Sequence, residues 1–136
     1  MSPRVFVYGT LKPGGYYWPS YAEGKVTAHG AAKVQGRLYD LAPGYPGLTL
    51  SEGWAEGVLL TLVNTAALAG FDELEGYVTG RDPALNEYQR VEVPCYSLDE
   101  EPLGIVWTYC MNEEKVQALG GIYLPEGRWD GPLSRD

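Results

Sequence analysis

Only one stretch of this chain has the clear periodicity of a helix, and this limits the folds that it can adopt. Residues 65–75 carry apolar side chains at helical spacing, follow the favourable N-cap Asn64 and precede Gly76, which is suited to ending a helix. The other apolar runs are short and are broken by many of the 18 glycines and 10 prolines. Strands and helices do not alternate regularly, so the sequence predicts an α+β fold with a mixed or barrel-like sheet of five or six strands flanked by short helices.

Strands are predicted where β-branched and aromatic residues cluster between turn residues. They cover residues 5–8, 31–41, 57–63, 88–93 and 103–109, with a turn over residues 43–47. Gly36 indicates a bulge in the second strand, and the last two strands are expected to pair as a hairpin. A short helix is possible over residues 113–119 after Asn112, and the chain from residue 120 onward is predicted to be an irregular arm.

Length and composition indicate a single folded domain over residues 1–136. The chain has 136 residues, and 45% of them are hydrophobic, which is typical of one globular domain. The formal net charge of -8 has the wrong sign for binding a phosphate backbone or an anionic membrane surface, so we expect neither nucleic acid nor membrane as a partner. No apolar stretch has the length of a signal-peptide core or a transmembrane span, which favours a cytoplasmic protein. The oligomeric state stays open.

The sequence lacks the residue patterns of several kinds of catalytic site. Cys95 and Cys110 match no metal or redox spacing and are predicted to be core thiols, and His29 is the only histidine, so we expect no bound metal. Residues 9–14 have the glycine spacing of a phosphate loop, but Gly15 stands where the lysine should be, which disfavours a nucleoside triphosphate site. Any catalysis must therefore rest on carboxylates, tyrosines, hydroxyls and backbone amides.

Glu75 is the candidate residue for acid–base chemistry. Projected on a helix, it lies close to Phe71 at the edge of the apolar face, whereas Asp72 lies at the rim. Burial and the negative end of the helix dipole both disfavour a charged carboxylate, so both are expected to raise the pKa of Glu75. The alternative is structural: Glu75 turns outward at a frayed helix end, or it pairs with Arg81 or Arg90.

The glycine-rich loop after the first predicted strand is the candidate binding element. A sharp change of direction over residues 9–15 can leave several backbone N–H groups pointing at one spot, which forms a nest for an anion or an oxyanion. Backbone donors act over short distances, so such a nest could hold a carboxylate substrate even in an acidic protein. The alternative is an ordinary glycine turn that binds nothing.

The loop and the glutamate occur together in a pattern that resembles the γ-glutamylcyclotransferase-like family, in its AIG2-like or γ-glutamylamine cyclotransferase branch. The run Tyr8-Gly9-Thr10-Leu11 resembles the opening signature of that family, and residues 71–77 resemble the end of its catalytic helix. Further similar segments are residues 36–41, 45–48, 88–90, 106–109 and 127–129. The resemblance therefore covers nearly the whole chain in order. It implies a mixed β-barrel flanked by helices, with a pocket at one end between the loop and the glutamate.

The resemblance implies a γ-glutamyl cyclotransferase that requires no cofactor. In such enzymes the α-amine of a γ-glutamyl group attacks its own side-chain carbonyl, which releases an amine or amino acid and 5-oxoproline. The catalytic glutamate of the family falls on Glu75, which would act as general acid/base. The substrate-binding loop of the family falls on Tyr8, Gly9, Thr10 and Leu11.

Other positions and other functions stay open. Tyr88, Arg90 and Tyr109 are weaker candidates, because positioning the loop or holding the glutamate would explain them equally well. Residues 78–87 could line the leaving-group side of the pocket. The loop has Thr10 where the glutathione-degrading branch typically has serine, which argues against glutathione as the substrate. The competing hypotheses are a non-catalytic protein of the same fold that binds a small carboxylate or a partner, and an amide hydrolase that uses the same pocket.

Overall fold

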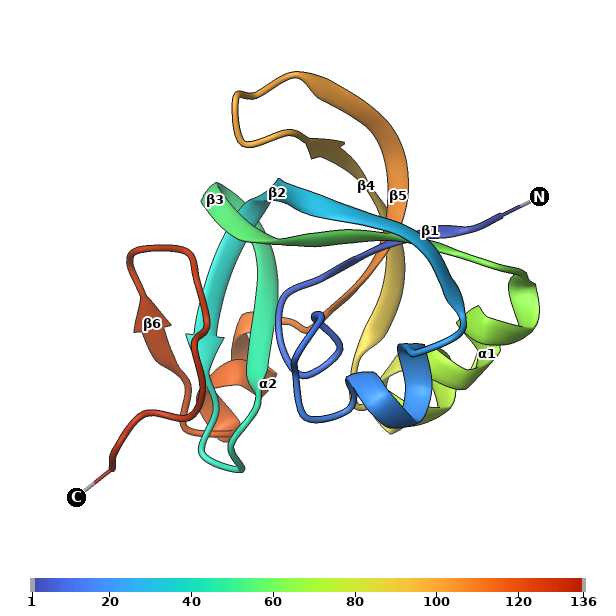
Figure 1. Ribbon diagram of the computed structural model, residues 1–136. Coiled ribbons are helices and arrows are strands. Elements are labelled where there is room, and N and C mark those ends of the chain that lie inside the picture. Colours follow the sequence, from blue (N-terminus) through green and yellow to red (C-terminus); the bar gives the residue numbers. More distant parts are fainter. Residues whose placement is uncertain (1, 136) are drawn as a thin grey trace.

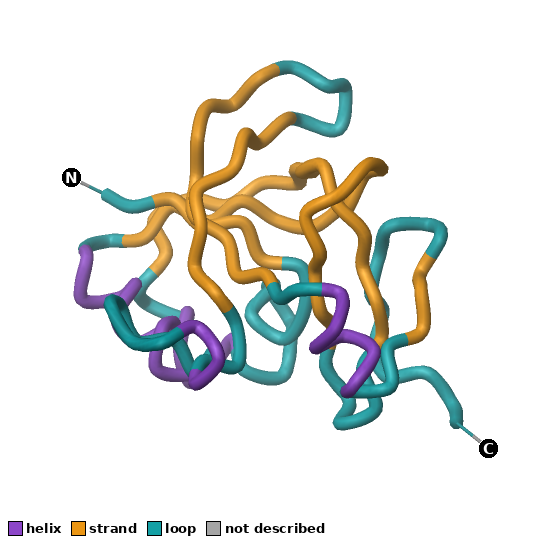
Figure 2. The backbone as a smooth tube through the Cα atoms, turned by 180° about the vertical axis from the view of Figure 1, so that it is seen from behind, coloured by secondary structure: helices purple, strands orange, loops and turns teal. Residues whose placement is uncertain are grey.

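The computed structural model describes residues 2–135, which form a mixed β-sheet with short helices at one end. The strands within this range are β1 (Arg4–Val7), β2 (Val26–Asp40), β3 (Pro46–Leu62), β4 (Gln89–Tyr96), β5 (Pro102–Cys110) and β6 (Ile122–Leu124). The α-helices are α1 (Thr65–Leu74) and α2 (Glu113–Ala118), and shorter helical turns lie at Trp18–Ala22 and Pro83–Leu85. Figures 1 and 2 show the helices near one end of the strands, whereas the β4–β5 hairpin extends beyond the other end.

The six strands of the described chain form one mixed sheet that nearly closes into a barrel. Hydrogen bonding follows the order β3–β1–β5–β4–β2–β6, and β2 also pairs with β3, which completes a ring of five strands. Neighbouring strands are antiparallel except β1 and β5, which run parallel. Closure is weak, because within residues 2–135 β2 and β4 pair only at Lys33 and Tyr96. The predicted α+β class with five or six strands is confirmed, and the barrel character is partial.

The long β2–β3 hairpin departs most from the sequence prediction. β2 begins well before the expected strand. Residues 46–56 belong to β3, although residues 46 and 47 were expected in a turn and residues 48–56 were not predicted as a strand. These residues are rich in glycine and polar side chains, and they are held extended because β2 and β3 pair along most of their lengths. The predicted bulge at Gly36 is confirmed, since the register shifts between Gln35 and Arg37. A Cβ atom at Gly36 would lie 2.7 Å from the carbonyl oxygen of Thr49, so this position has room only for glycine.

Both predicted helices form, and capping residues mark where they begin. The side chains of Asn64 and Asn112 each accept a hydrogen bond from a backbone N–H group in the first turn of the following helix. α1 ends at Leu74, so that Glu75 is the C-cap, and Gly76 follows with a φ of 65°. Over residues 2–135 no helix is both long and apolar enough to cross a membrane.

The C-terminal arm is more ordered than its sequence suggests. Its first part forms β6, which pairs with the end of β2. Its later part packs on Asp40, a fully buried carboxylate that accepts hydrogen bonds from the indole of Trp129 at 2.8 Å and from Arg135 at 3.0 Å. The prediction of an irregular arm is therefore wrong for residues 122–124, because pairing with a strand remote in sequence overrides the local glycine and proline signals.

β1 lies between two hydrophobic clusters and positions the loop that follows it. Val7 belongs to the cluster that contains Phe71 of α1, whereas Phe6 belongs to a cluster formed with β2, β3, β4 and β5. Successive strand residues face opposite sides of a sheet, so burial on both sides explains the uninterrupted apolar run of β1. The predicted core thiols Cys95 and Cys110 are buried, and burial raises the pKa of Cys110 to about 11.

Candidate active site

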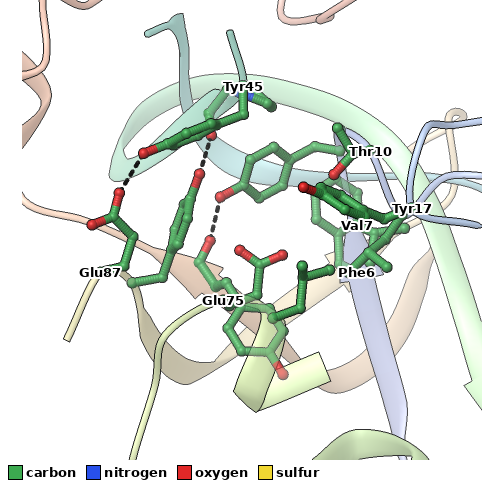
Figure 3. A pocket seen from close by; sticks show the side chains of 14 residues that line it. Phe6, Val7, Thr10, Tyr17, Tyr45, Glu75 and Glu87 are labelled. Atoms are coloured by element: carbon green, nitrogen blue, oxygen red, sulfur yellow. Dashed lines mark hydrogen bonds between the residues drawn. The ribbon is translucent and has the colours of Figure 1, made fainter. Parts of the chain in front are cut away.

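A cavity of about 320 Å³ lies at the C-terminal end of β1. Its lining residues are Phe6, Val7, Tyr8, Gly9, Thr10, Leu11, Tyr17, Tyr45, Pro46, Leu74, Glu75, Glu87, Tyr88 and Tyr109. Glu75 and the loop of residues 8–11 therefore border one space, at the place where the family resemblance implied a pocket. Figure 3 shows the carboxylate of Glu75 pointing into this space from the end of α1.

The carboxylate of Glu75 has no hydrogen-bond donor among residues 2–135, and neither candidate arginine reaches it. Arg81 donates to the backbone carbonyl of Gly76 at 3.1 Å. Arg90 pairs with Asp72 at 2.9 Å. The alternative in which Glu75 turns outward or pairs with one of these arginines is therefore wrong, and its carboxylate is open to a ligand in the cavity.

The surroundings of Glu75 favour its protonated form. Burial, followed by the negative charge of Glu87, raises the pKa of Glu75 to about 8. The direction agrees with the expectation from the helical pattern, whereas the contribution of Glu87 was not foreseen. A carboxyl group with this pKa is present in both protonation states near neutral pH, so it can both take up and return a proton.

Backbone hydrogen bonds hold Glu87 next to Glu75. The N–H group of Glu87 donates to the carbonyl of Gly76 at 3.0 Å, and that of Tyr88 donates to the carbonyl of Glu75 at 3.3 Å. Gly76 is needed here because its φ is positive and because a Cβ atom would lie 2.9 Å from the Cβ of Glu87. Gly76, which follows the end of α1, therefore also leaves room for the segment that carries Glu87.

Three tyrosine hydroxyls around the cavity donate hydrogen bonds of 2.5 Å within the protein, drawn in Figure 3. The pairs are Tyr8 with the carbonyl of Tyr109, Tyr88 with the carbonyl of Pro46, and Tyr45 with Oε1 of Glu87. Burial is the largest cause that raises the pKa of all three phenols, and nearby carboxylates raise these pKa values further. The three side chains therefore remain neutral and form a fixed wall around the two carboxylates.

Asp72, Arg90 and Tyr109 form a cluster beside the cavity. Asp72 accepts hydrogen bonds from the hydroxyl of Tyr109 at 2.7 Å and from Arg90 at 2.9 Å, and the guanidinium of Arg90 lies 4.4 Å from the ring centroid of Trp107. Of the three weaker sequence candidates, Tyr88 and Tyr109 line the cavity, whereas Arg90 does not. Arg90 and Asp72 hold the end of α1 against β4 and β5.

The loop after β1 is held by close packing and carries free backbone donors. Within residues 2–135 no acceptor binds the N–H groups of residues 9–11. Gly9 is required for space, since a Cβ atom there would lie 2.6 Å from Cγ of Pro46. Lys12 fastens the loop to the C-terminal arm by donating to the carbonyl of Trp129 at 3.0 Å.

Sequence reasoning did not single out Tyr45 or Glu87 as individual residues of the cavity wall. Of residues 78–87, which were expected to line the leaving-group side, Glu87 alone borders the described cavity. Nothing in the local sequence distinguishes Glu87 from other exposed loop glutamates, because its place depends on backbone pairing with Gly76. For Tyr45 the available signal was its position in one of the segments that resemble the family.

Comparison with known proteins identifies the family. Residues 5–131 match the family described as Gamma-glutamyl cyclotransferase, AIG2-like. The chain is also 33% identical, over 112 residues, to the Gamma-L-glutamyl-butirosin B gamma-glutamyl cyclotransferase of Niallia circulans, and this match covers 82% of this chain and 69% of that protein. The chain therefore belongs to the γ-glutamyl cyclotransferase, AIG2-like family, and this makes it an enzyme of the γ-glutamyl cyclotransferase class.

Solved structures share the fold. An AIG2-like protein of Mus musculus has a TM-score of 0.66 at 20% identity, over 95% of this chain and 88% of that chain. A protein of Arabidopsis thaliana has a TM-score of 0.64 at 27% identity, over 96% and 70% of the two chains. YkqA of Bacillus subtilis has a TM-score of 0.66 at 20% identity, and the match covers 95% of this chain but 40% of YkqA. This chain thus spans less than half the length of YkqA.

Proposed function

We propose that this enzyme cyclises a small γ-glutamyl amine and that Glu75 transfers the protons. The α-amine nitrogen of the glutamyl group attacks the γ-carbonyl carbon, and the tetrahedral intermediate collapses by breaking the bond to the leaving nitrogen. The products are 5-oxoproline and a free amine or amino acid. The attacking ammonium loses two protons in all; Glu75 takes each in turn and passes it to the leaving nitrogen, which departs as an ammonium, so the enzyme ends in its starting state. The balance requires neither water nor a cofactor.

The raised pKa of Glu75 is the observation that best supports this role. An α-amine has a reference pKa of about 7.7 to 8.0, so it is largely an ammonium near neutral pH and cannot attack. Because the pKa of Glu75 is about 8, moving that proton to its carboxylate costs almost no free energy. With an ordinary glutamate pKa of about 4.3, the proton would have moved from the α-amine to the carboxylate in only roughly one complex in several thousand.

Residues 8–11 are proposed to bind the glutamyl group. They line the cavity together with Glu75, and the N–H groups of residues 9–11 have no acceptor within residues 2–135. Donors of this kind can hold a carboxylate and can stabilise the negative oxygen of a tetrahedral intermediate. A glutamyl group held at this loop would keep its amine and its carbonyl in the conformation that closes the ring.

The proposed substrate is a small molecule with a γ-glutamyl amide bond. The relative from Niallia circulans is named for γ-L-glutamyl-butirosin B, which is a substrate of this kind. The cavity volume of about 320 Å³ is at the lower end of the range for small-molecule sites. It suits a glutamyl group and its reacting amide, so a larger leaving group must extend beyond it.

The test is to incubate the purified enzyme with a panel of γ-glutamyl amines and amino acids and to measure 5-oxoproline by mass spectrometry. Glu75→Gln should bind ligand but lose turnover by roughly two to four orders of magnitude, the usual scale of general acid–base catalysis. Glu73→Gln is the matched control, because Glu73 is exposed on the same helix. Near-normal turnover in Glu75→Gln would overturn the role of Glu75. Free glutamate as the product would indicate a hydrolase, and no product from any compound would favour a binding protein.

A further inference from the structure

Glu87 lies at the boundary between two cavities. It lines the cavity that contains Glu75, and it also lines a second cavity of about 630 Å³ next to β4, β5 and α2. Lys115 of α2 and Gln89 of β4 are among the residues that line this second cavity. Glu87 is the residue that the two described linings share, so the two cavities adjoin at this residue.

Glu87 lies on the side toward which the proposed binding mode directs the leaving group. In Figure 3, Thr10 and Tyr17 lie on one side of the Glu75 carboxylate, and Glu87 lies on the opposite side. If the loop of residues 8–11 holds the glutamyl group and Glu75 transfers protons at the reacting amide, the leaving nitrogen and its substituent point away from the loop. Glu87 is the charged side chain that this substituent meets.

One oxygen of Glu87 is occupied and the other is available to a ligand. Oε1 accepts a hydrogen bond of 2.5 Å from the hydroxyl of Tyr45. Oε2 forms an ion pair with Nζ of Lys115 at 3.6 Å, but this distance is longer than an N–H···O hydrogen bond, and Lys115 donates its hydrogen bond to the carbonyl of Asn86. Within residues 2–135 no group donates a hydrogen bond to Oε2, and the side chain of Glu87 is 39% exposed. Oε2 can therefore accept a hydrogen bond from a substrate.

We propose that Glu87 is a specificity-determining residue that selects leaving amines with a second, cationic group, as in a γ-glutamyl diamine. The inference rests on the proposed function, because it assumes that residues 8–11 hold the glutamyl end. An ammonium a few bonds from the leaving nitrogen would donate a hydrogen bond to Oε2 in competition with the longer ion pair from Lys115, and hydrogen bonds between charged groups are stronger than neutral ones. The net charge of -8 acts in the same direction by attracting cations to the protein.

The test compares two substrates that differ in one charged group, the γ-glutamyl amides of 1-aminobutane and of 1,4-diaminobutane. The value of kcat/KM, measured from 5-oxoproline, should be about tenfold higher for the cationic amide at low salt, and the preference should shrink as salt is added. The difference should lie in KM, because Glu87 contacts the leaving group and not the reacting bond. Glu87→Gln should bring the two substrates close to parity. Glu101→Gln, which removes an exposed charge from the β4–β5 turn, should keep the preference.

Binding measurements separate this inference from the proposed function. In Glu75→Gln, calorimetry gives the affinity for each compound without turnover, and Glu75→Gln combined with Glu87→Gln tests the second carboxylate. Equal affinities, or a preference that survives Glu87→Gln, would overturn the role of Glu87 even if the wild type makes 5-oxoproline. A charge preference that requires Glu87, in an enzyme that makes no 5-oxoproline, would support Glu87 and overturn the proposed reaction.

Discussion

Replacing Glu75 by glutamine should stabilise the protein by an amount that depends on pH. The pKa of Glu75 rises from 4.5 to about 8 on folding, so the folded state binds this proton more tightly than the unfolded chain does. The stability that comes from the neutral carboxyl group is complete below about pH 4.5 and is lost progressively as the pH rises to about 8. At about 1.36 kcal/mol per pH unit, the loss is about 3 kcal/mol at pH 7 and about 5 kcal/mol above pH 8. Glutamine has nearly the same shape and carries no charge, so the variant avoids this loss.

Urea unfolding of the wild type and of Glu75→Gln between about pH 5 and pH 9 measures this effect. The difference in the free energy of unfolding should grow from about 1 kcal/mol to about 5 kcal/mol across the range. Glu73→Gln, the exposed control on the same helix, should show no such growth. A difference that stays constant from pH 5 to pH 9 would refute the reasoning, because it would mean that folding does not change the pKa of Glu75. If the difference in the free energy of unfolding grows with pH as expected, the raised pKa of Glu75 that is proposed to serve catalysis also lowers stability, as is common at active sites.

Three further predictions concern the pH profile, the loop and the C-terminal arm. The value of kcat/KM should be bell-shaped in pH with a maximum near pH 8, because the reaction needs one proton shared between Glu75 and the α-amine: at lower pH both groups are protonated and no base remains, and at higher pH both are deprotonated and no acid remains for the leaving nitrogen. Initial rates at low substrate concentration check this, and a plateau extending down to about pH 5 would contradict it. Gly9→Ala should raise KM roughly tenfold or more in steady-state kinetics, because the new Cβ atom would lie 2.6 Å from Cγ of Pro46 and displace the loop, whereas an unchanged KM would exclude the loop from binding. Asp40→Asn should lower the free energy of unfolding at neutral pH by about 2 kcal/mol, because a charged hydrogen bond from Arg135 is lost, and an unchanged urea midpoint would disprove this.

The features predictable from the sequence are those that depend on residues a few positions apart. Asn64 and Gly76 mark the ends of α1, and the helical period places Glu75 at the edge of the apolar face between them. The β-branched run of residues 5–8 identifies the buried strand that leads into the loop. Capping and periodicity act within one or two turns of chain, so a single sequence is enough to locate the loop and the glutamate.

Tertiary structure alone decided what surrounds these two elements. Glu87 contributes to the pKa of Glu75 because its backbone pairs with Gly76, and Arg90 is kept from Glu75 because it pairs with Asp72. Strand pairing likewise makes residues 46–56 part of β3 and residues 122–124 part of the sheet. These contacts join residues that are far apart in the chain, and their free energy comes from burial and hydrogen bonding that exist only once the fold has formed. The sequence by itself therefore determined that a glutamate and a glycine-rich loop are present at the ends of two elements. The resemblance to a known family implied a pocket between them, and only the fold determined which side chains line that cavity and that a second carboxylate lies beside Glu75.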